Sequence, residues 1–116
     1  MLPNVWDGGS ARLIESLGAR ALATPSAGVA WAQGYPDGDL LPVPLLRAAV
    51  EVIARVAHVP LSVDLEGGYS DDPAAVGEIV TQVVDVGAVG INLEDGTRAA
   101  NVLCAKIGRA SCRERV

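Results

Sequence analysis

Two short segments of this chain end in carboxylates followed by glycine. The first is 61–69, with the sequence LSVDLEGGY, and the second is 89–96, with the sequence VGINLEDG. Each begins with an apolar run rich in β-branched residues, which is typical of a buried strand. Each segment therefore predicts a strand that delivers acids to its C-terminal end. Clustered carboxylate oxygens are hard ligands of the kind that Mg²⁺ prefers.

The spacing of the two segments predicts that their acids lie at one edge of a sheet. Asp64 and Glu94 are 30 residues apart, and the interval contains a helix-like pattern over 74–86. A strand, a helix and a second strand of this length indicate a βαβ unit with parallel strands and a right-handed crossover. Such folds carry their chemistry at the carboxyl ends of the strands.

The rest of the chain continues the alternation of strand and helix. Glycine and proline are concentrated in 25–41, which predicts a long loop, and loops of that length in compact domains tend to be functional. The pattern indicates an α/β fold with a mostly parallel sheet or half of a (β/α)₈ barrel. The expected elements are the end of a strand at 2–5, a helix at 11–17 capped by Ser10, a strand at 21–24, a helix at 43–57, a strand at 61–66, a helix at 74–86 capped by Asp72, and a strand at 89–93.

Composition narrows the class of protein. The 116 residues are 50% hydrophobic with a net charge of −5, which favours one folded domain or part of a larger one and argues against nucleic acid or an anionic membrane as a partner. No apolar run approaches the roughly 18 residues of a membrane span, and no signal sequence follows Met1, so we expect a cytoplasmic protein. Cys104 and Cys112 have no second pair of cysteines, which supports neither a zinc site nor a disulfide framework.

The last ten residues differ in character from the chain before them. The segment 107–116, IGRASCRERV, places three arginines in the last eight positions. It resembles the translation of a sequencing adapter, and we expect a domain over 1–106 followed by a non-native tail over 107–116. The alternative is a natural basic tail.

Four motifs in order resemble the isocitrate lyase and phosphoenolpyruvate mutase superfamily, in particular its small bacterial members. They are PNVWDGGSARLIE, ATPSAGVAWAQGYPDG, LSVDLEGGY and GAVGINLEDG. The resemblance implies a (β/α)₈ barrel of which this chain is the N-terminal half, from about the first to the fourth parallel strand. A full-length form would be a homo-oligomer.

The resemblance also implies a metal site and a substrate site. Carried over by motif, the ligands of Mg²⁺, or of Mn²⁺ in its place, are Asp37, Asp64, Glu66 and Glu94. The segment Ser26, Ala27 and Gly28 matches the one whose backbone N–H groups hold a substrate carboxylate, although Pro25 removes one donor. Taken singly, each acid is as readily a solvated residue or a helix cap, and SAG alone is more often a turn.

The resemblance predicts a lyase or mutase that breaks or forms a carbon–carbon or carbon–phosphorus bond. Its substrate would be a small 2-oxo or 2-hydroxy carboxylic acid, or a phosphonate, which reacts through a pyruvate-type enolate. The Lys-Arg-Cys-Gly-His loop of the isocitrate and methylisocitrate lyases is missing, because the region reads GTRAANVLCAKI. Cys104 and His58 are therefore interpreted as structural, and no catalytic acid or base is assigned.

Two other hypotheses remain open from the sequence. The chain could be a catalytically inactive fragment of such an enzyme. A receiver-like phosphoacceptor module also clusters acids at strand ends, but it needs paired acids after its first strand and a lysine after its fifth. Here Asp7 stands alone and Lys106 follows the fourth strand. Nucleotide-binding glycine motifs are absent from the sequence.

Overall fold

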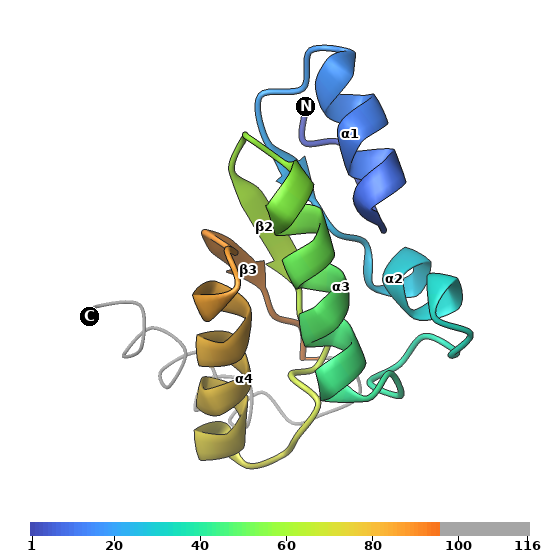
Figure 1. Ribbon diagram of the computed structural model, residues 1–116. Helices are drawn as coiled ribbons and strands as arrows, with labels where there is room; N and C mark the ends of the chain where they lie inside the picture. Colours follow the sequence, from blue (N-terminus) through green and yellow to red (C-terminus); the bar gives the residue numbers. More distant parts are fainter. Residues whose placement is uncertain (96–116) are drawn as a thin grey trace.

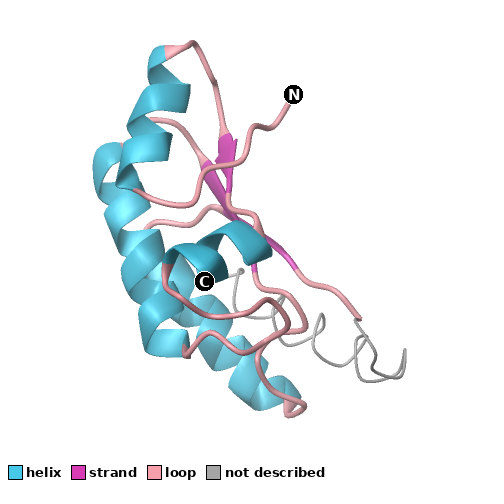
Figure 2. Ribbon diagram, turned by 90° about the vertical axis from the view of Figure 1, so that its right-hand side faces the viewer, coloured by secondary structure: helices cyan, strands magenta, loops and turns pink. Residues whose placement is uncertain are grey.

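The protein folds as an α/β structure in which helices cover one face of a parallel sheet. The computed structural model describes residues 1–95. Figure 1 shows the course of the chain, and Figure 2 shows the helices on one side of the strands. The elements are α1 (Gly8–Ser16), β1 (Leu22–Ala23), α2 (Ser26–Ala32), α3 (Val43–Val56), β2 (Leu61–Asp64), α4 (Pro73–Asp85) and β3 (Gly90–Asn92).

The strands are parallel and follow the order β1-β2-β3. In this register Leu22 pairs with Leu61, and Asp64 at the end of β2 pairs with Asn92 at the end of β3. The parallel α/β fold expected for the start of a (β/α)₈ barrel is therefore confirmed. The carboxyl ends of β2 and β3 lie at one edge, as the spacing of the acids requires.

The segment expected to end a first strand forms only an isolated parallel bridge between Asn4 and Ala23. The Ala23 N–H donates to the Pro3 carbonyl at 3.0 Å, and the Val5 N–H donates to the Ala23 carbonyl at 2.8 Å. Pro3 has no N–H of its own to extend the ladder toward the N-terminus. The segment thus occupies the position of a strand next to β1 without the length of one.

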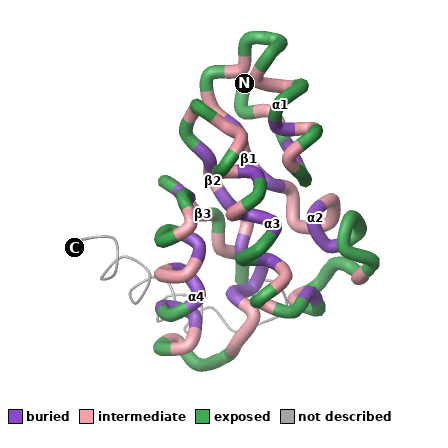
Figure 3. The backbone as a smooth tube through the Cα atoms, in the orientation of Figure 1, coloured by how far each residue is buried: buried purple, intermediate pink, exposed green. Residues whose placement is uncertain are grey.

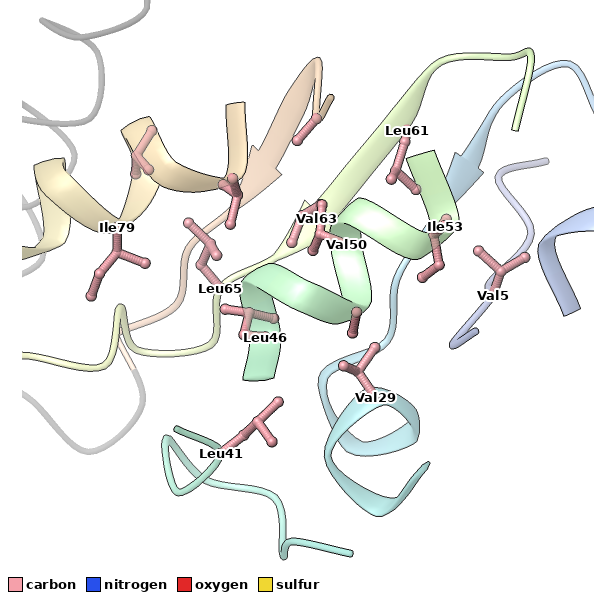
Figure 4. Packing of buried hydrophobic residues seen from close by; sticks show 14 of the residues in the cluster. Val5, Val29, Leu41, Leu46, Val50, Ile53, Leu61, Val63, Leu65 and Ile79 are labelled. Atoms are coloured by element: carbon pink, nitrogen blue, oxygen red, sulfur yellow. The ribbon is translucent and has the colours of Figure 1, made fainter. Parts of the chain in front are cut away.

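Side chains alternate between the two faces of β2. Leu61 and Val63 are buried, whereas Ser62 and Asp64 are half-buried. The apolar side packs against α3, where Val50 lies close to Val63 in Figure 4. The polar side faces away from the helices, which leaves it available to line a site.

The core lies between the sheet and the helices α3 and α4, where buried residues concentrate in Figure 3. Helix α3 contributes one apolar stripe because its apolar residues recur at helical spacing. The largest fully buried side chains are Leu22, Leu46, Ile53, Leu61, Leu65, Val5, Val50, Val63, Val76, Val80 and Val83. In residues 1–95 no helix combines the length and the apolar character that crossing a membrane requires.

Two predictions about the first helices were wrong. Helix α1 begins at Gly8, and its cap is Asp7, whose Oδ1 accepts the Ser10 N–H at 2.6 Å. The hydroxyl of Ser10 accepts the Asp7 N–H in return, which completes a capping box. The expected loop 25–41 contains the helix α2. Burial of Val29 and Ala30 stabilises this helix despite the nearby glycines.

The predicted cap of α4 is confirmed, since Asp72 accepts the Ala74 N–H.

The Asp7 cap predicts a pH-dependent contribution to stability. The hydrogen bond from the Ser10 backbone lowers the pKa of Asp7, so the charged cap stabilises above the ordinary pKa and is lost as the pH falls through the lowered value. Asp7→Ala should reduce the free energy of unfolding by about 1 kcal/mol at pH 7. Urea unfolding at pH 7 and at pH 3 measures this. Asp7→Asn keeps an uncharged cap and serves as control, and an Asp7→Ala deficit that is equal at both pH values would contradict the argument.

Candidate functional site

The candidate site lies at the carboxyl edge of the sheet, beside its uncovered face. The loop after α2 and the turn after β2 lie on the lower side of Figure 1. A pocket of about 510 Å³ opens here against the polar side of the strands. It is lined by Leu2, Asn4, Ala23, Thr24, Pro25, Ser26, Ala27, Ser62, Asp64, Ile91 and Asn92.

Two of the predicted metal ligands, Asp37 and Glu66, are hydrogen-bonded to each other through their carboxyl groups. Glu66 is only 6% exposed, and its Oε1 accepts the Gly38 N–H at 2.9 Å. Burial, and then the bond to Asp37, raises the pKa of Glu66. The same bond, with a further one from Ser26, lowers the pKa of Asp37. The two shifts are opposite in direction, so Asp37 is the stronger acid of the pair and Glu66 the weaker.

Asp64 is fixed between this pair and the neighbouring strand. Its Oδ1 accepts the Glu66 N–H at 2.9 Å, and its own N–H donates to the Thr24 hydroxyl at 3.1 Å. Thr24 is only 4% exposed, so this bond is formed in the interior. Asp64 thus stands at the rim of the pocket, in hydrogen-bond contact with the segment that holds Glu66.

Glu94 is at the same edge but is joined to the others only through the backbone. It follows the end of β3 by two residues, and its N–H donates to the Glu66 carbonyl at 2.7 Å. Its side chain is exposed. The structure therefore links Asp37, Asp64 and Glu66 by direct hydrogen bonds, and it places Glu94 beside them.

The arrangement fits a metal ion held partly through water. Within residues 1–95 no three Asp, Glu, His or Cys side chains converge closely enough to form a direct cage for a metal. Mg²⁺ is usually bound by one or two carboxylates and keeps several of its waters. Two hydrogen-bonded carboxyl groups, with Asp64 close by, supply an all-oxygen donor set of this type. The residues thus fit Mg²⁺ better than a metal that needs three or four protein ligands.

The predicted substrate segment is the first turn of α2, not a separate turn. The first intrahelical bond of α2 runs from the Val29 N–H to the Pro25 carbonyl, so the preceding N–H groups of Ser26, Ala27 and Gly28 have no acceptor within the helix. A Cβ on Gly28 would lie 2.9 Å from Cγ of Pro25, which explains why the smallest residue stands there. Ser26 and Ala27 line the pocket.

Sequence reasoning missed three residues that organise the site: Thr24, Asp39 and Tyr69. Asp39 accepts backbone N–H groups of the turn after β2, and the Tyr69 hydroxyl is hydrogen-bonded to Glu66. Burial raises the pKa of Tyr69, so the phenol stays protonated. The signal available in the sequence was the position of Asp39, two residues after the predicted ligand Asp37.

Of the two residues interpreted as structural, the structure describes His58 but not Cys104. His58 does have a partner, since its Nδ1 lies 3.2 Å from Oε1 of Glu15 and its N–H donates to the same carboxylate. This contact joins the end of α1 to the segment before β2, at the opposite end of that strand from Asp64 and Glu66. Cys104 and the tail 107–116 lie outside the described residues.

Comparison with known proteins identifies the family. The model of the family described as phosphoenolpyruvate phosphomutase matches residues 1–113. This chain belongs to that family. A crystal structure of a Burkholderia cenocepacia J2315 protein assigned as a phosphonomutase superposes with a TM-score of 0.92 at 41% identity, over 97% of this chain and 48% of that one.

Curated proteins that are similar to this chain support the same superfamily assignment. An uncharacterised protein of Mycobacterium tuberculosis is 37% identical over 84% of this chain and 36% of its own length. The 2-methylisocitrate lyase of Aeropyrum pernix is 30% identical over 80% of this chain and 30% of its own length. The resemblance to the isocitrate lyase and phosphoenolpyruvate mutase superfamily is confirmed. The chain spans about a third of these curated relatives and less than half of the solved structure.

The buried bond between Thr24 and Asp64 gives a test of how the site is held. Thr24→Val leaves the Asp64 N–H without its acceptor, which should cost about 1–3 kcal/mol of unfolding free energy. Thr24→Ser keeps the hydroxyl and is the control. Hydrogen exchange separates the two variants, because the Asp64 amide should exchange faster only in Thr24→Val. Equal exchange of that amide in both variants would show that the hydroxyl does not hold Asp64.

Proposed function

We propose that these residues belong to a Mg²⁺-dependent lyase or mutase acting on a small 2-oxo or 2-hydroxy carboxylic acid or a phosphonate. The observation that carries the proposal is the hydrogen bond between the carboxyl groups of Asp37 and Glu66, with the Asp64 carboxylate bonded to the Glu66 N–H, beside a pocket on the open face of the sheet. Membership of the phosphomutase family supports it. The ion would be held by Asp37, Asp64, Glu66 and Glu94, with Mn²⁺ as the alternative.

Each group at the site has a distinct role in this proposal. The bound ion would supply a positive charge that stabilises an enolate oxygen. Thr24 orients Asp64 through its hydroxyl, and Glu66 orients it through its N–H. The backbone N–H groups of Ser26, Ala27 and Gly28 would bind the substrate carboxylate. Burial of Glu66 keeps water away from one side of the site, which strengthens the electrostatic interactions there.

The bond that is broken or formed is a carbon–carbon or a carbon–phosphorus bond. Both a phosphonomutase assignment and a 2-methylisocitrate lyase occur among the similar proteins. The sequence lacks the Lys-Arg-Cys-Gly-His loop expected of the isocitrate-type lyases. This absence favours a member with another leaving group. The homo-oligomeric state and the cytoplasmic location remain predictions.

The metal role of Asp64 can be tested in the full-length protein that carries this sequence. Asp64→Asn should lower Mg²⁺-dependent turnover by at least about 100-fold, because a neutral amide binds Mg²⁺ poorly and a lost metal interaction is worth several kcal/mol. Asp85→Asn, an exposed change at the far end of α4, is the matched control. Turnover of oxo acids and phosphonates is measured across a Mg²⁺ titration. Wild-type activity that survives removal of divalent metal would refute the metal assignment.

A second expectation follows from the fraction of the family that this chain covers. We propose that residues 1–116 alone are catalytically inactive, because the rest of the barrel would supply further substrate contacts and would cover the open face of the sheet. An exposed edge of parallel strands favours self-association. Size-exclusion chromatography and assays with Mg²⁺ would compare this chain with a longer form. A monomeric and fully active 116-residue chain would show that no further strands are needed.

A further inference from the structure

Asp39 connects the loop between α2 and α3 with the turn that follows β2. Its Oδ1 accepts the N–H groups of Gly67 at 3.0 Å and of Tyr69 at 3.3 Å. In return, the Glu66 carboxylate accepts the N–H groups of Gly38 and Asp39. Each loop therefore supplies one carboxylate to the backbone of the other. We refer to this contact, made by the side chains of Asp39 and Glu66 with those backbone N–H groups, as the carboxylate clasp.

The backbone marks the carboxylate clasp as an unusual place in the fold. Within residues 1–95, the non-glycine residues with positive φ are Asp39 at 60°, Glu66 at 50° and Tyr69 at 60°. All three belong to this one contact. Residues with side chains adopt the left-handed region rarely, and they persist there when the surrounding interactions require it, most often at functional sites.

The carboxylate clasp also determines where the acids of the site lie. Asp37 is two residues from Asp39 and is hydrogen-bonded to Glu66, which in turn is hydrogen-bonded to the Tyr69 hydroxyl. No regular helix or strand lies between α2 and α3 to hold Asp37 in place. Asp39 makes the side-chain bonds from this loop to the turn at Gly67 and Tyr69.

We propose that Asp39 is a positioning residue for the metal-binding acids, acting through Glu66 and Asp37. This inference rests on the proposed Mg²⁺ function and deepens it. Asp39 binds the turn so that the Glu66 carboxyl faces Asp37, and it fixes the loop that carries Asp37. Leu41, which is fully packed in the core near the end of the same loop (Figure 4), anchors that end independently. Loss of the Asp39 side chain should therefore loosen the geometry of the acids without unfolding the domain.

Three variants at one position separate the acceptor from the backbone conformation. Asp39→Gly removes both accepted hydrogen bonds and adopts positive φ without strain. Asp39→Asn keeps an acceptor oxygen and tolerates the left-handed region, so it is the conservative rescue. Asp39→Ser, with a shorter side chain, supplies a second loss variant if Asp39→Gly does not fold. Thermal unfolding confirms that each variant is folded at the temperature used.

Two measurements on the full-length protein test the inference. Hydrogen exchange without metal measures the exchange rates of the Gly67 and Tyr69 amides. Calorimetry with Mg²⁺ alone measures the affinity for the metal. Asp39→Gly should speed exchange of these two amides about tenfold, as loss of a hydrogen bond to a charged group implies. It should weaken Mg²⁺ binding by about 10-fold or more, as loss of a group that orients metal ligands does. Asp39→Asn should stay within about twofold of wild type in both, since its amide oxygen still accepts the two bonds.

The outcomes distinguish this inference from the function on which it rests. Wild-type protein that binds no Mg²⁺ overturns the proposed function, and the metal role of Asp39 falls with it. Wild-type binding that Asp39→Gly leaves unchanged overturns the inference alone. Faster amide exchange and a lower unfolding temperature at unchanged Mg²⁺ affinity would assign Asp39 a purely structural role, and this result too would overturn the inference.

Discussion

A carboxyl group that is buried away from water needs hydrogen-bond partners. The need to supply such partners for Glu66 determines how the loops pack at this edge of the sheet. Glu66 is 6% exposed, and it lies only two residues after the end of β2, which limits how far it can move. The partners come from a loop 28 residues earlier in the chain, through the Gly38 N–H, and from the carboxyl group of Asp37. An unpaired carboxylate at this position would be costly. Satisfying Glu66 therefore brings the loop after α2 against the turn after β2.

The sheet and its helices supply the rigid support for that edge. Helix α3 packs its buried residues on β2, and α4 extends the same layer (Figures 1 and 4). Parallel pairing of β2 with both neighbours aligns the strand ends, so that residues following β1, β2 and β3 share one rim. The core thus fixes the backbone positions, and hydrogen bonds between loops fix the side chains.

Membership of the phosphoenolpyruvate phosphomutase family gives this geometry its functional context. The Burkholderia cenocepacia structure superposes on almost all of this chain, so the two proteins share this arrangement of strands and helices. The receiver-like alternative is set aside by the same match. The polar side of β2 remains uncovered within residues 1–95, where the pocket opens beside Asp64. The same pocket is lined by Ser26 and Ala27 of the first turn of α2.

The sequence by itself determined the three strands β1, β2 and β3, their parallel pairing and the edge at which Asp64 and Glu94 lie. Apolar runs such as 61–64 and the helical stripe of 43–56 are local patterns, and the rule that crossover units are right-handed turns them into a topology. Only the tertiary structure decided how the acids are used. Three features depend on contacts between residues about 30 positions apart: the burial of Glu66, its hydrogen bond to Asp37, and the binding of the Gly67 and Tyr69 amides by Asp39. The helix α2 was also not predicted from the sequence. The glycine and proline residues of 25–41 suggest a loop, whereas burial of Val29 and Ala30 stabilises a helix there. Local residue types specify what a segment prefers, and the partners that it meets in the fold decide which preference prevails.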